Sequence, residues 1–529
     1  MILRSTTILA AAALLAGYAW HQPAASGPPA QSCAALAGLA LSKGKIDSAV
    51  PVAAGAGVET DPGKPGIPAA AAFCRVKATI SAGPGSSIKV EVWLPELAAW
   101  NGKLLGAGNG GFGANLSIPS LLMRGAVGRG YAAVGTDMGH YGASDVDGGW
   151  ALNAPEKIKD YGWRANHLGA EAAKQIVAAY YPAPLTAAYF HGCSDGGRQA
   201  LMEAQRFPED YDAVIAGAPA IPWTRMATAF AEDYRAIQKP GADLPLDKLK
   251  LLQTASLAQY DAQDGVKDGV IENPRTCRFD PGVLQCKAGE TGGQCLSPAQ
   301  VATARHFYQG VRDAAGKPFY PGYAPGAEGE GSTWSLWLTG ATPQHGKFST
   351  QFFRNMVHND AAWDFGSFDP ARDYALARAR VGGDLDADNP DLGAFFRRGG
   401  KLIMYHGWQD AAIPPGNSIA YFERVQRTRP AQAKASVRLF MVPGMSHCLM
   451  GPGPNVFDAL GTLDAWRQGG PAPERMTATK TDNDLFGYLG FPARTLRTRP
   501  LCAWPRVARW TGKGSTDDAA NFACVAPGK

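Results

Sequence analysis

The feature that most constrains the fold is the pentapeptide Gly192-Cys-Ser-Asp-Gly196, which stands between a β-type run and a run of helix-forming residues. A serine at a sharp turn from strand to helix has a strained backbone, and glycines on both sides let neighbouring chain pass closely. The N-terminus of the following helix also favours negative charge that develops near the serine. A bare Gly-x-Ser-x-Gly pattern often arises by chance, but in this context it predicts an α/β fold with Ser194 as a nucleophile.

A serine nucleophile needs a base, and the base needs a carboxylate that orients it. In folds with this type of turn, the acid and then the histidine follow the serine along the chain. The stretches Lys401–Asp410 and Val437–Cys448 each have the pattern of a strand that ends in a loop. Open α/β sheets place their sites at such carboxyl ends of strands. We therefore predict that Asp410 and His447 complete a catalytic triad with Ser194.

The other histidines that we considered fit this order less well. His140, His167 and His191 precede or adjoin the serine. His406 lies four residues before the predicted acid and is interpreted as a packed residue at the end of a strand. An ordinary loop histidine is the alternative interpretation of His447, whose position after a strand favours the catalytic one.

Acyl transfer to a serine also needs N–H donors for the oxyanion that forms on the substrate. The backbone N–H of Asp195, directly after the nucleophile, is one predicted donor. The stretch Gly106–Gly113 follows an early β-type run, and its glycines let the backbone approach a substrate carbonyl closely. Either Gly110 or Gly111 is predicted to be the second donor, and a flexible turn is the alternative interpretation of these glycines.

The first 26 residues have the pattern of an export signal, with Arg4 before the short apolar run Ile8–Ala16 and small residues around Ala24. An uncleaved membrane anchor is the alternative, but the apolar run is shorter than the roughly 20 residues that cross a bilayer. We therefore expect a secreted or periplasmic protein with no membrane segment after cleavage. The net charge of +5 is small for 529 residues, and Lys and Arg are scattered, so no nucleic-acid partner is expected.

Export makes disulfides the expected state of the nine cysteines, because cysteines pair in an oxidising compartment. The odd count leaves at least one thiol over, and no cysteine spacing typical of a zinc site occurs in the sequence. Cys193 directly precedes Ser194, and Cys448 directly follows His447. If nucleophile and base come together, the two sulfurs come close enough to form a disulfide that fastens both loops. Two unrelated cysteines are the alternative.

Several longer stretches resemble the tannase and feruloyl esterase family, which also contains mono-hydroxyethyl terephthalate hydrolase. The resemblance covers nearly the whole mature chain and rests on Gly108–Gly113, Thr136–His140, Tyr161–His167, Gly192–Arg198, Ala204–Ala220, His406–Asp410 and Val442–Pro454. The Cys-Ser and His-Cys steps are the most specific of these features. The resemblance implies an α/β-hydrolase fold, the triad named above and a Cys193–Cys448 disulfide beneath it.

The resemblance also implies a large lid domain inserted into the hydrolase core. The β-type runs of the core stop near Ala220 and resume near Gly399. This gives a signal peptide at 1–26, hydrolase core at 27–221, the lid at 222–398 and core again at 399–529. Four lid aromatics are candidates for a wall against a flat acyl ring, with a small core of the lid's own as the alternative: Trp334, Trp337, Phe352 and Phe353.

A structural calcium ion is expected in the lid, because similar segments of the family bind calcium. The corresponding ligands here are the side chains of Asp261, Asp264 and Asp268 and the carbonyls of Val266 and Val270. From the spacing alone, an acidic surface turn is the simpler interpretation. The ion is expected to hold the lid in shape and to take no part in the chemistry.

The family resemblance also guides the remaining cysteines. Relatives often have a Cys immediately before the first of these aspartates, bridged to one shortly after the loop. This chain has Tyr260 there, so Cys277 is predicted to be the odd thiol. The other predicted pairs are Cys33–Cys74, Cys286–Cys295 and Cys502–Cys524.

Together these residues predict ester hydrolysis through an acyl-Ser194 intermediate, with structural calcium and no organic cofactor. The resemblance implies a small ester of an aromatic acid as the partner, first a feruloyl ester, with galloyl or terephthaloyl esters as alternatives. A peptidase of the same fold and a non-catalytic ligand-binding protein on a hydrolase frame are the rivals from other classes. The complete triad argues against the binding protein, which has no need of all three residues. The oligomeric state stays open.

Overall fold

The computed structural model describes residues 32–60, 63, 65–113, 115–290 and 292–527. Within these residues a ten-stranded sheet has the strand order β1-β2-β5-β6-β8-β7-β9-β10-β13-β14. The four strand pairs from β1 to β8 are antiparallel. The five pairs from β8 to β14 are parallel. The signal peptide predicted at 1–26 lies outside the described residues.

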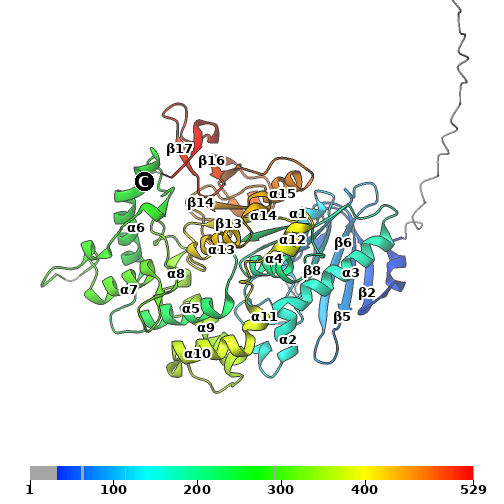
Figure 1. Cartoon of the computed structure of the whole chain (residues 1–529), viewed down its shortest axis with the longest axis horizontal. Coiled ribbons are helices and arrows are strands. Elements are labelled where there is room, and N and C mark those ends of the chain that lie inside the picture. Colours follow the sequence, from blue (N-terminus) through cyan, green and yellow to red (C-terminus); the bar gives the residue numbers. More distant parts are fainter. Residues whose placement is uncertain (1–31, 61–62, 64, 114, 291, 528–529) are drawn as a thin grey trace, which may run out of the picture.

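The strands are coloured in chain order in Figure 1, from blue at β2, β5 and β6 to yellow and orange-yellow at β13 and β14. The antiparallel strands therefore precede the parallel ones along the chain, as well as lying at one edge of the sheet. The strands of this sheet are β1 (Ala40–Leu41), β2 (Gly44–Val52), β5 (Phe73–Ile80), β6 (Ile88–Pro95), β7 (Lys103–Ala107), β8 (Ala132–Thr136), β9 (Ala187–Cys193), β10 (Ala213–Gly217), β13 (Lys401–Gly407) and β14 (Val437–Val442).

Helices cover both faces of the parallel part of the sheet. The covering helices are α1 (Ser117–Val127), α3 (Ala165–Tyr180), α4 (Asp195–Arg206), α13 (Gly416–Thr428) and α15 (Ala459–Arg467). Successive residues of a strand point to opposite faces, so Phe190 and Val214 pack with α3, α4 and α13. Tyr189 and Ile215 pack with α1 and α15 on the other face. Because both faces are buried, β10 is apolar throughout, and the α/β-hydrolase fold is confirmed.

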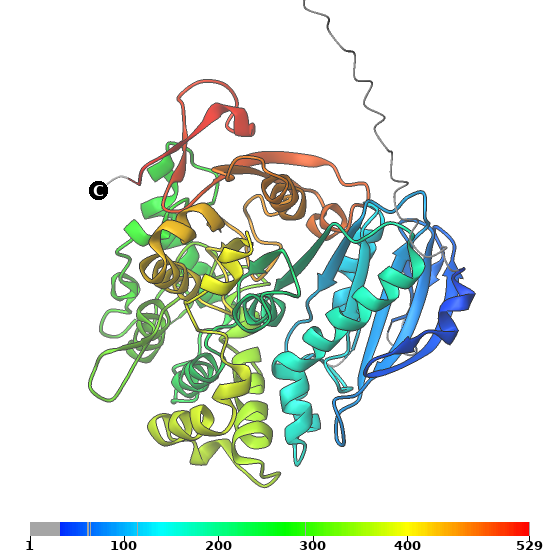
Figure 2. The same ribbon diagram turned by 45° about the vertical axis from the view of Figure 1, so that its right-hand side comes forward.

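Between β10 and β13 the chain leaves the sheet and forms a mainly helical segment. In the sequence this segment corresponds to the lid predicted at 222–398. Figures 1 and 2 show it as the green to yellow helices on the side of the molecule away from the N-terminal strands. Its two described strands pair with each other and not with the large sheet. Its elements are α5 (Trp223–Ile237), α6 (Leu246–Tyr260), α7 (Pro298–Gln309), β11 (Val311–Arg312), β12 (Pro318–Tyr320), α8 (Trp334–Trp337), α9 (Gln344–Gln351), α10 (Pro370–Ala377), α11 (Gly383–Leu385) and α12 (Gly393–Arg397).

Smaller elements complete the fold. After β14 the chain forms two separate antiparallel pairs, β15 with β16 and β17 with β18. A further pair, β3 with β4, lies near the N-terminus. The remaining helices and strands are β3 (Gly57–Val58), β4 (Ile67–Pro68), α2 (Pro155–Lys159), α14 (Pro430–Ser436), β15 (Arg475–Thr481), α16 (Asp484–Tyr488), β16 (Thr495–Cys502), β17 (Val507–Trp510) and β18 (Phe522–Val525).

The structure joins the cysteines in the same four pairs that the sequence predicts. These are Cys33–Cys74, Cys193–Cys448, Cys286–Cys295 and Cys502–Cys524. Cys277 is the free cysteine, as expected from the residue at position 260. There the hydroxyl of Tyr260 accepts the backbone N–H of Arg278 at 2.8 Å, so a hydrogen bond braces this loop.

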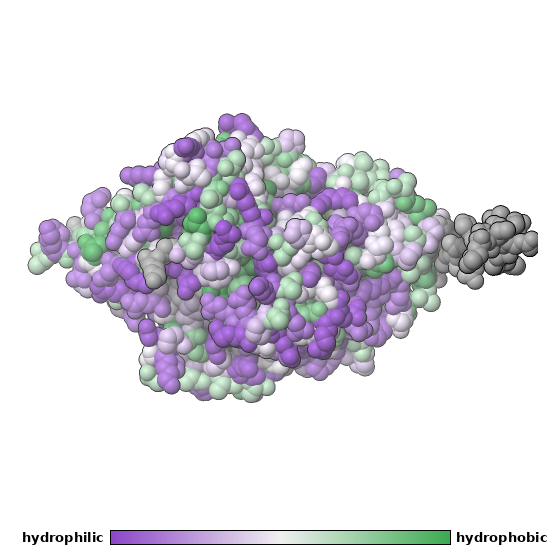
Figure 3. Space-filling model, turned by 45° about the horizontal axis from the view of Figure 1, so that its top comes forward, coloured by the Kyte–Doolittle hydropathy of each residue, from purple (hydrophilic) through white to green (hydrophobic). Residues whose placement is uncertain are grey.

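No helix in the part of the chain that the structure describes is both long enough and apolar enough to cross a bilayer. Figure 3 shows hydrophilic residues over much of the face in view, with hydrophobic residues in small scattered groups.

Helix α4 begins directly above the ends of β9 and β10, and this close approach depends on glycines. A Cβ atom at Gly192 would lie 2.3 Å from the carbonyl oxygen of Gly196. A Cβ atom at Gly197 would lie 2.2 Å from the carbonyl oxygen of Gly217, at the end of β10. Both obstacles are backbone atoms of buried elements, so neither moves aside at low cost.

We expect Gly197→Ala to lower the free energy of unfolding by about 1–3 kcal/mol, because the added methyl group forces α4 away from the sheet. The matched control is Gly125→Ala in α1, where a Cβ atom meets nothing within 4 Å. Alanine is the better helix former, so this control should unfold at an equal or higher temperature. Thermal unfolding followed by circular dichroism measures both variants. Equal unfolding temperatures for the two would contradict the packing argument.

Candidate active site

Ser194 lies at the junction of β9 and α4, with φ of 63° and ψ of −123°. This left-handed backbone is unfavourable for a residue with a side chain and persists only when its surroundings hold it. The N–H of Ser194 donates to the carbonyl of Gly217 at 3.0 Å, and its carbonyl accepts the N–H of Ala220 at 3.1 Å. The end of β10 therefore holds the strained turn, and the serine side chain lines a cavity.

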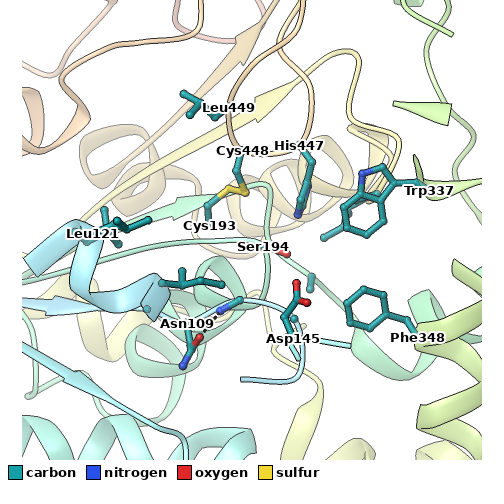
Figure 4. Close-up of a pocket in the computed structure, with 18 of the residues that line it drawn as sticks. Asn109, Leu121, Asp145, Cys193, Ser194, Trp337, Phe348, His447, Cys448 and Leu449 are labelled. Atoms are coloured by element: carbon teal, nitrogen blue, oxygen red, sulfur yellow. Dashed lines mark hydrogen bonds between the residues drawn. A yellow bond between two sulfur atoms is a disulfide. The ribbon is translucent and has the colours of Figure 1, made fainter. Parts of the chain in front are cut away.

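The predicted acid and base lie side by side. Nδ1 of His447 is 2.7 Å from Oδ2 of Asp410, a donor and acceptor in hydrogen-bonding contact. Oδ1 of Asp410 accepts the backbone N–H groups of Ala412 at 2.8 Å and Ile413 at 2.9 Å. With its Nδ1–H directed at a carboxylate, the imidazole presents an unprotonated Nε2 as a base. Figure 4 shows the ring of His447 directed toward the hydroxyl of Ser194.

A second imidazole contacts the same carboxylate. Burial by itself raises the pKa of Asp410, but the imidazoles of His447 and His406 and their hydrogen bonds outweigh burial and hold it well below its ordinary value. Nε2 of His406 lies 3.2 Å from Oδ2 of Asp410, and Nδ1 lies 2.7 Å from the hydroxyl of Ser418. The sequence interpretation of His406 as a packed strand-end residue does not include this contact with Asp410. The only sequence feature that points to the contact is the spacing of four residues between His406 and Asp410.

The Cys193–Cys448 disulfide joins the two loops that carry Ser194 and His447. Its two Cα atoms are 6.0 Å apart, although the residues are separated by 255 positions in the chain. Each sulfur belongs to the residue next to a predicted catalytic one, and Figure 4 shows the bond beside both side chains. The loops are thus covalently fixed to each other at the site.

Side chains of α4 hold the glycine-rich loop beside the serine. The N–H of Asn109 donates to Oε1 of Gln199 at 3.0 Å, and Nε2 of Gln199 donates to Oδ2 of Asp195 at 2.5 Å. The N–H of Gly110 donates to Oδ1 of Asn109 at 2.9 Å. Within the described residues, the N–H groups of Gly111 and Asp195 form no hydrogen bond. Of the two glycines predicted as oxyanion donors, Gly110 therefore already donates its N–H to a side chain, whereas the N–H of Gly111 is free to bind an oxyanion.

The carboxylate of Asp195, next to the nucleophile, is neutralised within the core. Nε of Arg198 lies 2.6 Å from its Oδ1, and both side chains are fully buried. The same guanidinium donates to the carbonyls of Gly162 at 2.7 Å and Tyr161 at 3.1 Å. This buried pair ties the first turn of α4 to the segment before α3.

Ser194 and His447 line a cavity of about 310 Å³, a volume in the lower part of the range for small-molecule sites. Its wall is mostly apolar and is drawn from both the hydrolase core and the inserted segment. The large apolar and aromatic lining residues are Ile118, Leu121, Leu122, Trp223, Met226, Phe230, Trp337, Phe348, Tyr405, Ile413, Leu449, Leu485 and Tyr488. An apolar group of a ligand fits such a wall better than a charged group does.

Of the four aromatic residues predicted to form this wall, Trp337 alone lines the cavity. Its ring centroid is 5.2 Å from that of His447. The other three do not line the cavity. Trp334 packs against Phe307 inside the lid, and Phe352 and Phe353 pack against each other in the core. Aromatic composition indicates burial, but not whether a ring faces the substrate or a neighbouring helix.

Other apolar residues of the same segment line the cavity. Trp223, Met226 and Phe230 lie at helical spacing on α5, and all three line the cavity. This spacing is the signal that the sequence offered, because residues three, four and seven apart share one face of a helix. Phe348 on α9 carries no comparable signal, since polar residues surround it in the sequence.

The structure surrounds one predicted calcium ligand with arginines. Oδ2 of Asp268 lies 2.9 Å from Nη1 of Arg497 and 2.6 Å from Nη2 of Arg499, both on β16. In the described part of the chain, no three acidic, histidine or cysteine side chains gather as a metal-binding group. The ion pairs therefore tie the lid loop to the C-terminal strands and already balance the charge of Asp268.

The other predicted ligands stay close along the same loop. Oδ1 of Asp261 accepts the backbone N–H groups of Asp268 at 3.1 Å and Val270 at 3.3 Å. Oδ1 of Asp264 accepts the N–H of Val266 at 2.9 Å. Burial, together with the nearby charge of Asp268, raises the pKa of Asp264 to about 6. The oxygen donors suit a hard cation, but as placed they bond to the loop's own backbone and to arginines.

Comparison with known proteins agrees with this fold. The chain matches the family model described as tannase and feruloyl esterase over residues 74–525. It is 38% identical to an uncharacterised esterase of Xanthomonas campestris pv. campestris, over 93% of this chain and 91% of that one. It is 34% identical to the mono(2-hydroxyethyl) terephthalate hydrolase of Piscinibacter sakaiensis, over 83% and 82%.

A solved structure also matches this chain over most of its length. The crystal structure of feruloyl esterase B from Aspergillus oryzae superposes with a TM-score of 0.83 at 29% identity, covering 93% of this chain and 99% of that one. The family model and the relatives both extend over most of the chain, so they include the elbow, the acid and the base. The chain therefore belongs to the tannase and feruloyl esterase family and is a carboxylic ester hydrolase.

Proposed function

We propose that this protein hydrolyses esters of aromatic carboxylic acids through an acyl-Ser194 intermediate. The observation that carries the proposal is that Ser194 and His447 line one cavity with an aromatic wall, and that Asp410 contacts the far side of the same imidazole. Feruloyl esters are the first choice of substrate, with galloyl and terephthaloyl esters as alternatives. The relatives named for feruloyl and mono(2-hydroxyethyl) terephthalate substrates support this class.

The reaction proceeds in two acyl transfers. Nε2 of His447 takes the proton of Ser194 as Oγ attacks the ester carbonyl, and the resulting tetrahedral intermediate expels the alcohol, which receives that proton. A water molecule then gives a proton to His447 and attacks the acyl-serine, and the serine recovers its proton as the acid leaves. Asp410 orients the imidazole and stabilises it when protonated. The free N–H groups of Gly111 and Asp195 are the proposed donors to the oxyanion.

The first test is a comparison of kcat/KM on methyl ferulate, methyl gallate, mono(2-hydroxyethyl) terephthalate and a short p-nitrophenyl alkyl ester. We expect a preference for one aromatic acyl group. Ser194→Ala should abolish turnover, and Asp410→Asn should reduce kcat by about 10³–10⁴-fold, because the wrong imidazole tautomer is favoured. A clear preference for the alkyl ester would contradict the aromatic pocket.

Two rival functions have separate readouts. A peptidase of the same fold predicts cleavage of the matching anilide or amide at a rate comparable to that of the ester. A non-catalytic binding protein predicts that a fluorophosphonate probe leaves Ser194 of the folded protein unlabelled. Labelling that disappears in Ser194→Ala, without amide cleavage, would support the esterase and exclude both.

We also propose that the protein is exported to an oxidising compartment, secreted or periplasmic, which the four disulfides support.

The double variant Cys193→Ser/Cys448→Ser should fold but lose about 2–4 kcal/mol of stability. We expect its kcat to fall as well, because the two catalytic loops are no longer fixed to each other. The control is Cys286→Ser/Cys295→Ser, which removes a disulfide that spans nine positions in the lid. An equal loss of kcat in both would contradict a specific role of the Cys193–Cys448 bond.

Calcium at Asp261, Asp264 and Asp268 is the remaining proposal, supported by the family resemblance and by the oxygen chemistry of the donors. Its role would be to brace the lid loop, with no part in the chemistry. If it binds, the unfolding temperature rises with free calcium, by an amount equivalent to about 2.7 kcal/mol at 100 times Kd. Asp264→Asn should remove that dependence. Identical melting in EDTA and in calcium would show that Arg497 and Arg499 balance the loop without a metal.

A further inference from the structure

The cavity beside Ser194 presents one negative charge that the proposed reaction does not use. Among the described residues that line it there is no Lys, Arg or Glu, and Asp145 is the single carboxylate. His191 also lines the cavity, but burial lowers its pKa to about 4, so it is neutral near pH 7. Apart from the catalytic imidazole, an entering substrate therefore meets one anionic group and no compensating cationic one.

The backbone of Asp145 is fixed beside the proposed oxyanion donor. Its carbonyl accepts the N–H of Phe112 at 2.7 Å. A Cβ atom at Gly111 would lie 2.3 Å from that same carbonyl oxygen, which shows how closely the two segments pack. The position of the carboxylate therefore depends on the loop that lines the site and not on a freely moving surface segment.

The carboxylate itself has no structural partner. Asp145 is exposed, and its side chain forms no hydrogen bond or ion pair within the described residues. By contrast, the nearby Asp147 accepts the backbone N–H groups of Ala143 at 3.1 Å and Gly149 at 2.9 Å. Figure 4 shows the carboxylate of Asp145 on the same side of the cavity as Phe348 and directed toward Ser194. Its oxygens are therefore available to a bound substrate.

We infer that Asp145 is a specificity-determining residue that selects uncharged, hydroxyl-bearing aromatic esters and disfavours esters that carry a free carboxylate. The inference rests on the proposed esterase function and refines its substrate class. A carboxylate accepts hydrogen bonds from phenolic or alcoholic hydroxyl groups, and it repels a second carboxylate across an apolar cavity. Feruloyl and galloyl esters offer such hydroxyls, whereas a terephthalate half-ester brings a negative charge. The same repulsion favours departure of the acid product, which leaves as an anion.

The test compares two substrates that differ in charge and scarcely in shape, methyl 4-carboxybenzoate and methyl 4-carbamoylbenzoate. Each has a single methyl ester, and the amide replaces the carboxylate without a change of size. The quantity to measure is the ratio of kcat/KM for the neutral ester to that for the anionic one. Intrinsic reactivity is the same for every enzyme variant, so a change in this ratio reports the protein alone.

Asp145→Asn keeps the side-chain shape and removes the charge. We expect it to lower the neutral-to-anionic ratio by about fivefold, as for unit charges about 8 Å apart at an effective dielectric constant of about 40. Added salt should lower the ratio in the wild-type protein and change it little in the variant. Inhibition by ferulate or 4-carbamoylbenzoate should also become stronger in Asp145→Asn, which is a readout independent of ester reactivity.

The matched control is Asp517→Asn, which removes the same unit of charge from an exposed position in the C-terminal segment, outside the cavity lining. It should leave the ratio unchanged. If both esters are hydrolysed and Asp145→Asn does not change the ratio, the inference is overturned while the proposed function stands. An equal shift in Asp517→Asn would show an effect of net charge and would also overturn it. If the wild-type protein hydrolyses no ester, the proposed function fails and the inference fails with it.

Discussion

The contact between the start of α4 and the end of β10 is the constraint on which the site depends. Ser194 adopts a left-handed backbone that only its neighbours make tolerable, through hydrogen bonds to Gly217 and Ala220. Side chains at Gly192 or Gly197 would collide with backbone at 2.3 and 2.2 Å. Because the helix comes this close, the serine hydroxyl projects beyond the sheet, and α4 also reaches the glycine-rich loop through Gln199.

The three carboxylates at this site differ in the groups that they contact, and not only in how deeply they are buried. The buried carboxylate of Asp410 is held by contacts with the imidazoles of His447 and His406, and that of Asp195 is paired with the buried guanidinium of Arg198. These contacts lower the cost of a charge in the core and fix the orientation of a group beside the serine. Asp145 differs from both, since its carboxylate faces the cavity without a protein partner. An unpartnered charge next to a substrate acts on the substrate, which is why it bears on specificity.

Much of this arrangement was predictable from the sequence where the signal is local. Strand-end positions and chain order predict the acid and the base, and the structure places Asp410 and His447 in contact at 2.7 Å. The predicted cysteine pairs are those of the structure. Cys193 and Cys448 pair because each adjoins a catalytic residue and the two catalytic residues must meet, and the other pairs are suggested by the family resemblance. Of the aromatic residues predicted for the wall, Trp337 lines the cavity, whereas Phe352 and Phe353 pack into the core. The direction in which such a side chain points depends on how whole helices pack against one another.

The sequence by itself determined the strand, turn and helix around Ser194 and the order of acid and base, because backbone geometry at a tight turn depends on immediate neighbours. The tertiary structure alone decided that Gly111 and not Gly110 has a free N–H, that His406 supports Asp410, and that arginines of β16 balance Asp268. It also decided that Asp145 faces the cavity. These contacts join segments far apart in the chain or separated by turns, and only the packing of the complete fold sets the distances between them.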